Sequence, residues 1–451
     1  MGILACVVCN QPAPTPAKAD KPKSPAPRDV EPAPKPASPT AKPAAPPPKT
    51  PKSSEPKARG VTYDDELATL RGRFEQHLKR TQKVPGRAPW QGAAGTAMQI
   101  ARLTGSYADY KIAEDTIGET FKTNSKHGAY LLRAKFNYHV HRIDVAQGDM
   151  EMAGRAAVAG GSKGAAGVAI LNGKLAMHRS EYDKALEFWA TANRLDKNSA
   201  DLTLALWAFK TADFETAERI YTHHSRNYHA RESEGIAWLH LMLAIMDLDR
   251  GRYDDALVHL DDADAQLSGY WLVDEHRAEI TALKGDLTTA ETMYRDIIKR
   301  TNSPEFMGAL AGVLLEASAE STEAKEWIER ANARFDEQIA LFPEAAYGHA
   351  LGHYLEFGPP KRALELARKN FKVRPNADAR IMLAQAELAM GDVKAARKAI
   401  DVAVASPWST ADLHETAYQV YTADGDAALA AEQLAKAKAI NPTVEAIEAA
   451  P

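Results

Sequence analysis

The chain has 451 residues, and at about 150 residues per domain this length allows roughly three domains. Hydrophobic residues make up 45% and charged residues 26%, which is ordinary for a globular protein, and the lack of an 18-residue apolar run predicts no membrane-spanning helix. The two Cys lie within the first nine residues, which excludes a disulfide framework or a Cys-rich zinc site in the rest of the chain. A formal net charge of −4 gives no support for nucleic-acid binding, so we expect no nucleic-acid partner.

Residues 10–58 form a Pro/Ala/Lys-rich segment. The first 60 residues hold 16 of the 26 Pro, and the first aromatic residue is Tyr63. Without apolar bulk such a segment cannot offset its chain entropy, so we expect a disordered, partly polyproline tether. An alternative is a Pro-rich ligand for an aromatic groove at residues 22–27. The tether carries a net charge of +5, which leaves about −9 on the remainder. This asymmetry fits either attraction to an anionic surface or simple solubility.

The first nine residues, MGILACVVC, give a hypothesis about location. Ile3-Leu4-Ala5-Cys6 resembles the end of a bacterial lipoprotein signal, in which a small residue precedes the Cys that takes lipid. The charged segment that normally begins such a signal is missing, and a start codon assigned too late would explain this. The resemblance implies a lipid-attachment site at Cys6 and a place in the periplasm or cell envelope. The alternative is a cytoplasmic protein with a simple tail.

From Tyr63 onward the sequence has the pattern of a chain built of helices. Ala, Leu, Glu, Lys and Arg dominate, and apolar residues recur three and four positions apart. Leu67, Leu70 and Phe74 begin an amphipathic helix, which Pro85, Gly86 and Pro89 interrupt. We therefore expect an N-terminal helix and a linker over residues 59–90.

An internal repeat follows. In each copy a turn precedes a small residue, with bulky or small residues four and seven positions beyond it. The small residues are Ala185, Ala217, Ala256, Ala290, Ala324, Ala363, Ala396 and Ala430, at a period near 34 residues. A helical hairpin of this length cannot bury its shared face alone. The small residue lets its two helices approach closely, and stacking on the next hairpin buries the rest.

These features resemble the tetratricopeptide repeat family. The residues that carry the resemblance are GDLTTAETMY from Gly285, GDVKAARKAI from Gly391, SEYDKALEFW from Ser180, and the closing Pro375 and Pro442. The resemblance implies an all-α solenoid of about ten repeats over residues 91–445, wound as a single right-handed superhelix. Since each hairpin of such a solenoid contacts only its neighbours, we expect one extended body with close helix contacts at Ala290 and Ala396.

Two further repeats precede the regular ones. Gly105, Tyr107 and Tyr110 indicate one. The register of the other, within residues 127–165, is open. Ile143, Ala146 and Met150 could start its second helix, or the turn could lie at Gly148 and Asp149. Gly160, Gly161 and Gly164 predict a loose linker after it.

The resemblance also implies a function and a set of binding residues. The family binds peptides along a concave face lined by the first helix of each hairpin. The corresponding positions here are Lys135, Lys174, Leu206, Ile245, Glu279, Gln385 and Gln419, with His349 and His353 at or beside this face. The Lys/Asn set with which some members clamp a C-terminal carboxylate is absent. We therefore expect a non-catalytic scaffold that binds a protein or peptide, without a cofactor or metal ion.

One alternative is an enzyme. His349, His353 and Glu356 lie at i, i+4 and i+7 of one expected helix, and two His one turn apart can bind a metal ion. No HExxH motif accompanies them, and packing or partner contact is the simpler interpretation. A second alternative is a cytoplasmic regulatory adaptor of the same repeat family.

Overall fold

The computed structural model describes residues 60–84, 86–122, 128–157, 161–227 and 233–446. Within these residues the chain folds into α-helices and contains no β-strand, only an isolated bridge between Thr62 and Ser268. The helices are α1 (Tyr63–Lys83), α2 (Arg87–Thr104), α3 (Tyr107–Lys122), α4 (Tyr130–His139), α5 (Ile143–Ala157), α6 (Gly161–His178), α7 (Tyr182–Leu195), α8 (Asp201–Lys210), α9 (Phe214–Arg226), α10 (Ser233–Asp249), α11 (Tyr253–Gln266), α12 (Trp271–Leu283), α13 (Leu287–Thr301), α14 (Pro304–Ala317), α15 (Thr322–Leu341), α16 (Pro343–Phe357), α17 (Pro360–Val373), α18 (Ala377–Ala389), α19 (Val393–Val404), α20 (Ala411–Ala423) and α21 (Ala427–Ile440).

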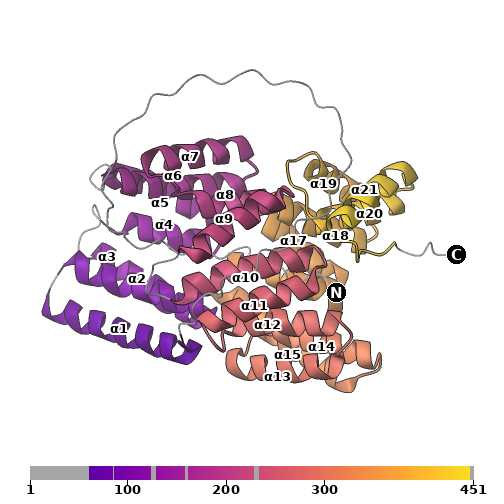
Figure 1. Cartoon of the computed structure of the whole chain (residues 1–451), viewed down its shortest axis with the longest axis horizontal. Coiled ribbons are helices and arrows are strands. Elements are labelled where there is room, and N and C mark those ends of the chain that lie inside the picture. Colours follow the sequence, from indigo (N-terminus) through magenta and orange to yellow (C-terminus); the bar gives the residue numbers. More distant parts are fainter. Residues whose placement is uncertain (1–59, 85, 123–127, 158–160, 228–232, 447–451) are drawn as a thin grey trace, which may run out of the picture.

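The helices after α1 pair into hairpins, from α2/α3 to α20/α21, and consecutive hairpins stack on one another (Figure 1). The all-α solenoid of tetratricopeptide-type hairpins expected from the sequence is therefore the observed fold. The helix α1 packs on α2 and extends the stack. None of the helices in the described ranges is long and apolar enough to cross a membrane.

The early part of the chain settles the open register. The second helix of the hairpin α4/α5 begins at Ile143, so Gly148 and Asp149 lie inside this helix rather than in a turn. The expected linker at Gly160, Gly161 and Gly164 was wrong at the last two, because α6 begins at Gly161 and includes Gly164, whereas Gly160 lies outside the described residues. The glycines of this segment are compatible with a helix that packs on α7.

A recurring turn positions the second helix of several hairpins. At Gly285, Gly391 and Gly425 the backbone has φ values of 87°, 77° and 80°, a left-handed conformation that glycine adopts without a steric penalty. The aspartate that follows each glycine caps the next helix. The side chain of Asp286, for example, accepts a hydrogen bond from the backbone N–H of Thr289 at 3.1 Å. The Gly-Asp pair thus ends one helix and starts the next.

The small residues of the repeat lie where the sequence places them. Seven of the eight alanines are 0% exposed and Ala430 is 5% exposed. Each lies on the second helix of its hairpin, from Ala185 on α7 to Ala430 on α21. A larger side chain at any of these positions has no free volume to enter.

We predict that Ala290→Leu and Ala396→Leu each lower the free energy of unfolding by about 1 to 3 kcal/mol, because the added atoms overpack a closed helix contact. Both alanines are fully buried. Urea denaturation followed by circular dichroism measures the change. Unaltered midpoints for both variants would mean that the close contacts lie elsewhere.

The expectation of one extended body with contacts only between neighbouring hairpins was wrong. Instead, residues far apart in the sequence pack together. Trp271 Nε1 donates a hydrogen bond to the carbonyl oxygen of Leu103 at 3.0 Å, across 168 positions, and Arg374 Nη1 lies 3.3 Å from His141 Nε2, across 233. The array therefore closes on itself, and helices of its first hairpins contact helices of later ones.

Two buried aromatic residues, Phe342 and Trp408, pack between the parts of the chain that meet at this closure. Phe342, between α15 and α16, is 0% exposed and packs against the rings of Tyr107, Tyr110 and Phe136 at 6.0 to 6.4 Å between centroids. Trp408, between α19 and α20, packs against the rings of Tyr182 on α7 and Trp207 on α8. In Figure 1, α10–α12 accordingly lie beside α1–α3, and α17 and α18 lie beside α8 and α9.

Candidate functional site: the inner surface

The residues expected to line a binding face all lie on first helices of hairpins. Lys135 is on α4, Lys174 on α6, Glu279 on α12, His349 and His353 on α16, Gln385 on α18 and Gln419 on α20. Of the two apolar positions, Leu206 on α8 is partly buried, whereas Ile245 on α10 is completely buried and cannot line a face. Cys6 lies outside the described residues.

Lys135 identifies an inward-facing surface. Its side chain is exposed to solvent, yet desolvation by the surrounding protein lowers its pKa, and the nearby Arg102 lowers it further. A side chain on a convex surface would be fully hydrated and would show no such effect. Lys135 thus reaches water and is also surrounded by protein atoms, and we call the surface on which it lies the inner surface.

Lys174 lies close to Lys135 on the same surface. Desolvation, followed by the charges of Lys135 and Arg102, lowers its pKa to about 8. Within the described residues neither lysine forms an ion pair with a carboxylate. The ring of Tyr138 lies 5.8 Å from Nζ of Lys174. Two unpaired cations thus face the same enclosed space.

Arg102 and Arg374 complete this group, which we call the basic inner cluster: Arg102, Lys135, Lys174 and Arg374. Arg102 on α2 pairs with Glu234 at 3.1 Å, and Arg374 is held by Asn370 Oδ1 at 2.9 Å. Arg374 follows α17, so the cluster joins the early helices α2, α4 and α6 to a hairpin late in the chain, and closure brings it together.

Three histidines line the basic inner cluster and carry no charge near neutral pH. Burial, followed by the charges of a neighbouring arginine and of Lys174, lowers the pKa of His139 and of His178 to about 3 in each case. The pKa of His141 also lies well below its ordinary value, through burial and then the charge of Arg374. The positive charge of the basic inner cluster therefore comes from its lysines and arginines alone, and the three histidines add none.

Carboxylates gather on another part of the inner surface. This acidic inner cluster consists of Asp249, Glu279, Asp378 and Asp412, with Lys210 beside Asp378 at 3.7 Å. Burial raises the pKa of Asp249 to about 6 and that of Asp412 to about 7, with nearby carboxylates adding to both shifts. Gln385 donates a hydrogen bond to Asp412 Oδ1 at 3.2 Å and so belongs to this region.

The set proposed for a metal enzyme does not come together. His353 is 6% exposed, its Nε2 lies 3.0 Å from Asn332 Oδ1, and its ring packs against Phe335. His349 instead faces Glu305 at 3.8 Å. Neither histidine belongs to a group of three or more potential ligands within the described residues, and neither does Glu356. His353 is a packing residue.

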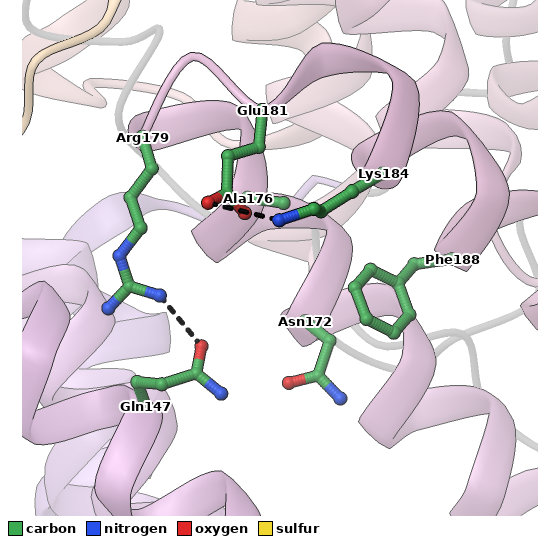
Figure 2. A pocket seen from close by; sticks show the side chains of 7 residues that line it. All are labelled: Gln147, Asn172, Ala176, Arg179, Glu181, Lys184 and Phe188. Atoms are coloured by element: carbon green, nitrogen blue, oxygen red, sulfur yellow. Dashed lines mark hydrogen bonds and ion pairs between the residues drawn. The ribbon is translucent and has the colours of Figure 1, made fainter.

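A separate pocket of about 240 Å³ lies among α5, α6 and α7 (Figure 2). Its lining residues are Gln147, Asn172, Ala176, Arg179, Glu181, Lys184 and Phe188. Its charged groups already have partners, since Arg179 donates to Gln147 at 3.0 Å and Lys184 pairs with Glu181 at 3.3 Å. The pocket thus offers a ligand less unpaired charge than the basic inner cluster does.

Sequence reasoning placed Lys135 and Lys174 on one face but missed Arg102 and Arg374. Arg102 lies near the end of a first helix, where the repeat register could have suggested it. Arg374 follows a second helix, and only the closure of the array brings it to the cluster.

No family model matches the chain, and no curated protein matches its sequence. Solved structures of helical-repeat proteins do resemble it. A tetratricopeptide repeat protein from Parabacteroides merdae is 15% identical, with 53% of this chain and 91% of that chain covered and a TM-score of 0.33. PilF of Pseudomonas aeruginosa is 17% identical over 46% of this chain and 93% of its own, with a TM-score of 0.28.

Human IFIT1, crystallised as a dimer with m7Gppp-AAAA, is 14% identical, with 84% of this chain and 96% of that chain covered and a TM-score of 0.37. All three TM-scores are below 0.5. The helical-hairpin architecture is therefore established by the helices and contacts of this chain itself.

Proposed function

We propose that the chain is a non-catalytic scaffold whose inner surface binds an extended segment of a protein, and that the bound segment is acidic where it meets the basic inner cluster. The observation that carries this proposal is the pair Lys135 and Lys174. Both are enclosed enough for desolvation to lower the pKa of each, and neither has a carboxylate partner within the described residues.

Enclosed like charges without counter-charges destabilise the protein that holds them. After desolvation, the charges of Lys135 and Arg102 lower the pKa of Lys174, and the charge of Arg102 lowers the pKa of Lys135, so these cations repel one another. A carboxylate supplied by a partner would relieve this repulsion and form charge-assisted hydrogen bonds in a partly dehydrated space. Since the body of the chain is acidic overall, a basic patch on its inner surface also discriminates between partners.

The acidic inner cluster would favour one orientation of the bound segment over the other. Asp249 and Asp412 lie on α10 and α20, away from the helices that carry the two lysines. A segment with acidic residues at one end and basic residues at the other would match both clusters. The reverse orientation would place like charges together, which electrostatic complementarity disfavours.

Selection from a random peptide library displayed on phage tests the proposed function. Bound peptides should be enriched in Asp and Glu, because only these side chains pair with the two lysines. The double variant Lys135→Glu/Lys174→Glu should lose these peptides. The double variant Lys299→Glu/Lys438→Glu, which makes the same charge change at exposed positions of α13 and α21, should keep them. Selected peptides without acidic enrichment, or lost equally in both variants, would contradict the proposal.

Binding of an acidic peptide should weaken as the pH rises through about 8. In the folded chain the pKa of Lys174 lies near 8, below its ordinary value of 10.5, so this residue loses its charge in that range. The neighbouring Arg102, whose pKa is raised by Glu234, stays charged, and the three histidines are neutral throughout. Fluorescence anisotropy of a labelled peptide between about pH 6.5 and 9.5 measures the loss.

The same shift predicts how stability depends on pH. Between about pH 8 and 10.5 the unfolded chain holds more protons on Lys174 than the folded chain does. The contribution of this residue to stability therefore rises with pH across that window, and Lys174→Met should remove it. Equal pH profiles of denaturation for the chain and the variant would contradict the low pKa.

We also propose that Cys6 anchors the chain to a bacterial envelope and that residues 10–58 act as its spacer. The support is the sequence around Cys6 and the Pro-rich composition that follows it. Cells that express the gene with its natural upstream region can be labelled with a palmitate analogue. Label in the membrane fraction that disappears in Cys6→Ser is the expected result, and unlabelled protein in the soluble fraction would contradict it.

A further inference from the structure

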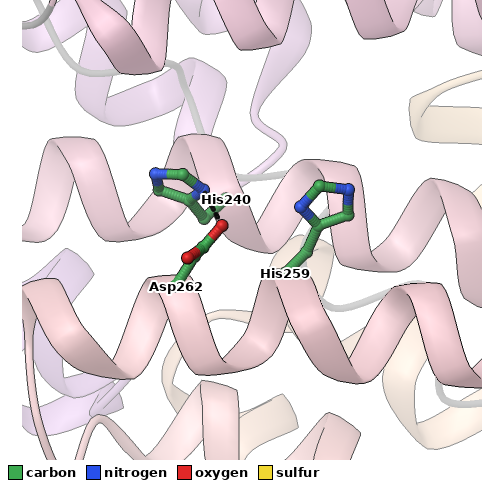
Figure 3. A group of neighbouring side chains, drawn as sticks. All are labelled: His240, His259 and Asp262. Atoms are coloured by element: carbon green, nitrogen blue, oxygen red, sulfur yellow. Dashed lines mark ion pairs between the residues drawn. The ribbon is translucent and has the colours of Figure 1, made fainter. Parts of the chain in front are cut away.

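Three potential metal ligands meet between two neighbouring helices of the middle of the array. His240 lies in the middle of α10, and His259 and Asp262 lie one turn apart on α11. One ligand atom from each of the three lies within 4.8 Å of the other two, and His240 Nδ1 is 3.5 Å from Asp262 Oδ2. Figure 3 shows the three side chains directed into the same gap between the helices.

The nitrogen atoms in this gap have no hydrogen-bond partner. Both ring nitrogens of His240, which is 6% exposed, and Nδ1 of His259 are buried without one. Only one nitrogen of each ring can face the gap, and His240 Nδ1 lies 3.5 Å from Asp262 without making a hydrogen bond. Buried polar atoms in folded proteins are nearly always paired, so the lack of hydrogen bonds on both imidazoles indicates room for a ligand between them.

The carboxylate of Asp247 lies beside the ring nitrogen of His259 that faces away from the gap. Asp247 Oδ2 lies 3.6 Å from His259 Nε2, and Asp247 is itself held by Arg252 at 3.5 Å. In metal sites the nitrogen that does not bind the ion commonly faces a carboxylate, which fixes the ring orientation. Asp247 therefore leaves Nδ1 of His259 free to point into the gap.

The site is open on one side. The side chains of His259 and Asp262 are 27% and 24% exposed, so an ion can enter and water can complete its coordination. Two imidazoles and one carboxylate suit zinc and related first-row ions, whereas magnesium and calcium prefer oxygen ligands alone.

We propose that His240, His259 and Asp262 bind one divalent first-row transition-metal ion, of which zinc is the best match, and that this ion joins α10 to α11. The proposal is independent of the binding role of the inner surface. A second group, Glu275, His276 and Glu279, carries no such proposal, because Nδ1 of its only histidine already lies 3.2 and 3.3 Å from the two carboxylates.

Titration of the chelator-treated full chain with Co²⁺, followed by competition with Zn²⁺, tests this site. We expect one ion per chain, with d–d absorption bands typical of a low-coordinate nitrogen and oxygen site. His259→Gln and Asp262→Asn should each weaken binding more than about 100-fold, and Asp247→Asn by about 10- to 100-fold. Both ligand variants are at partly exposed positions, and circular dichroism verifies that they fold.

The matched control is His224→Gln. His224 also lies beside a carboxylate, Asp201 at 3.2 Å, but no third ligand accompanies it within the described residues. This variant should bind Co²⁺ like the unaltered chain. Cys6 and Cys9 are present in every protein tested, and binding by them would appear as thiolate charge-transfer absorption that the variants leave unchanged. Absence of binding, or full binding in His259→Gln and Asp262→Asn, would overturn the proposal.

Discussion

Replacing Trp408 by alanine should lower the free energy of unfolding by about 3 to 5 kcal/mol, the usual range for a large buried aromatic residue. Trp408 is 2% exposed, and its ring lies 6.0 Å from that of Tyr182 and 6.3 Å from that of Trp207. Its Nε1 also donates a hydrogen bond to Asp378 at 3.2 Å. One side chain thus joins α7 and α8 to the last hairpins of the array.

The pattern of the loss is more informative than its size. In a solenoid with contacts only between neighbours, Trp408→Ala would loosen α18–α21 alone. In the closed array it should also reduce amide hydrogen-exchange protection in α6–α8, which lie 198 to 247 positions before Trp408 in the chain. Phe335→Ala is the control, because Phe335 is fully buried but packs on His353 of the adjoining helix. Loss confined to α18–α21 in the Trp408 variant would contradict the closure.

Phe342→Ala should have an effect of similar size, about 3 to 5 kcal/mol, at the other point of closure. Phe342 is 0% exposed, and the guanidinium group of Arg142 lies 5.2 Å from its ring in addition to the three aromatic contacts from α3 and α4. The alanine would leave a cavity between two parts of the chain that no adjoining hairpin can fill.

Differential scanning calorimetry and hydrogen exchange together measure this second effect. We expect a lower melting temperature and faster exchange in α3 and α4 as well as in α15 and α16. Since the basic inner cluster depends on the same closure, the variant should also bind an acidic peptide more weakly. A variant that melts lower but exchanges faster only around α15 and α16 would show that Phe342 has a local role.

The close packing of neighbouring helices could be predicted from the sequence. Each hairpin needs a small residue at its closest approach, so Ala185 to Ala430 recur at a near-constant period, and Gly-Asp pairs mark several turns. Where larger residues or several glycines replace these signals, the sequence was ambiguous, as at Gly148, or misleading, as at Gly161 and Gly164. A glycine inside a helix cannot be told from a linker glycine by local pattern alone.

The contacts that close the array could not be predicted from the sequence. Trp408 meets Tyr182, and Arg374 meets His141, through complementary shapes at positions that no repeat period relates. The same holds for the proposed metal site. His240 and His259 are 19 positions apart on two helices, a spacing that becomes meaningful only once the hairpin α10/α11 is folded. The sequence instead drew attention to His349 and His353, whose regular spacing on one helix is a consequence of packing.

The most direct test of the inner surface as the binding site is the affinity of one selected acidic peptide, measured by isothermal titration calorimetry at low and physiological salt. Binding should be one to one and should weaken with salt. Lys135→Glu/Lys174→Glu should weaken it by about 100-fold, since each reversal replaces an attraction with a repulsion in a partly dehydrated space. Lys299→Glu/Lys438→Glu should leave it within about twofold, as expected for exposed charges. Equal affinities for the two double variants would contradict the account.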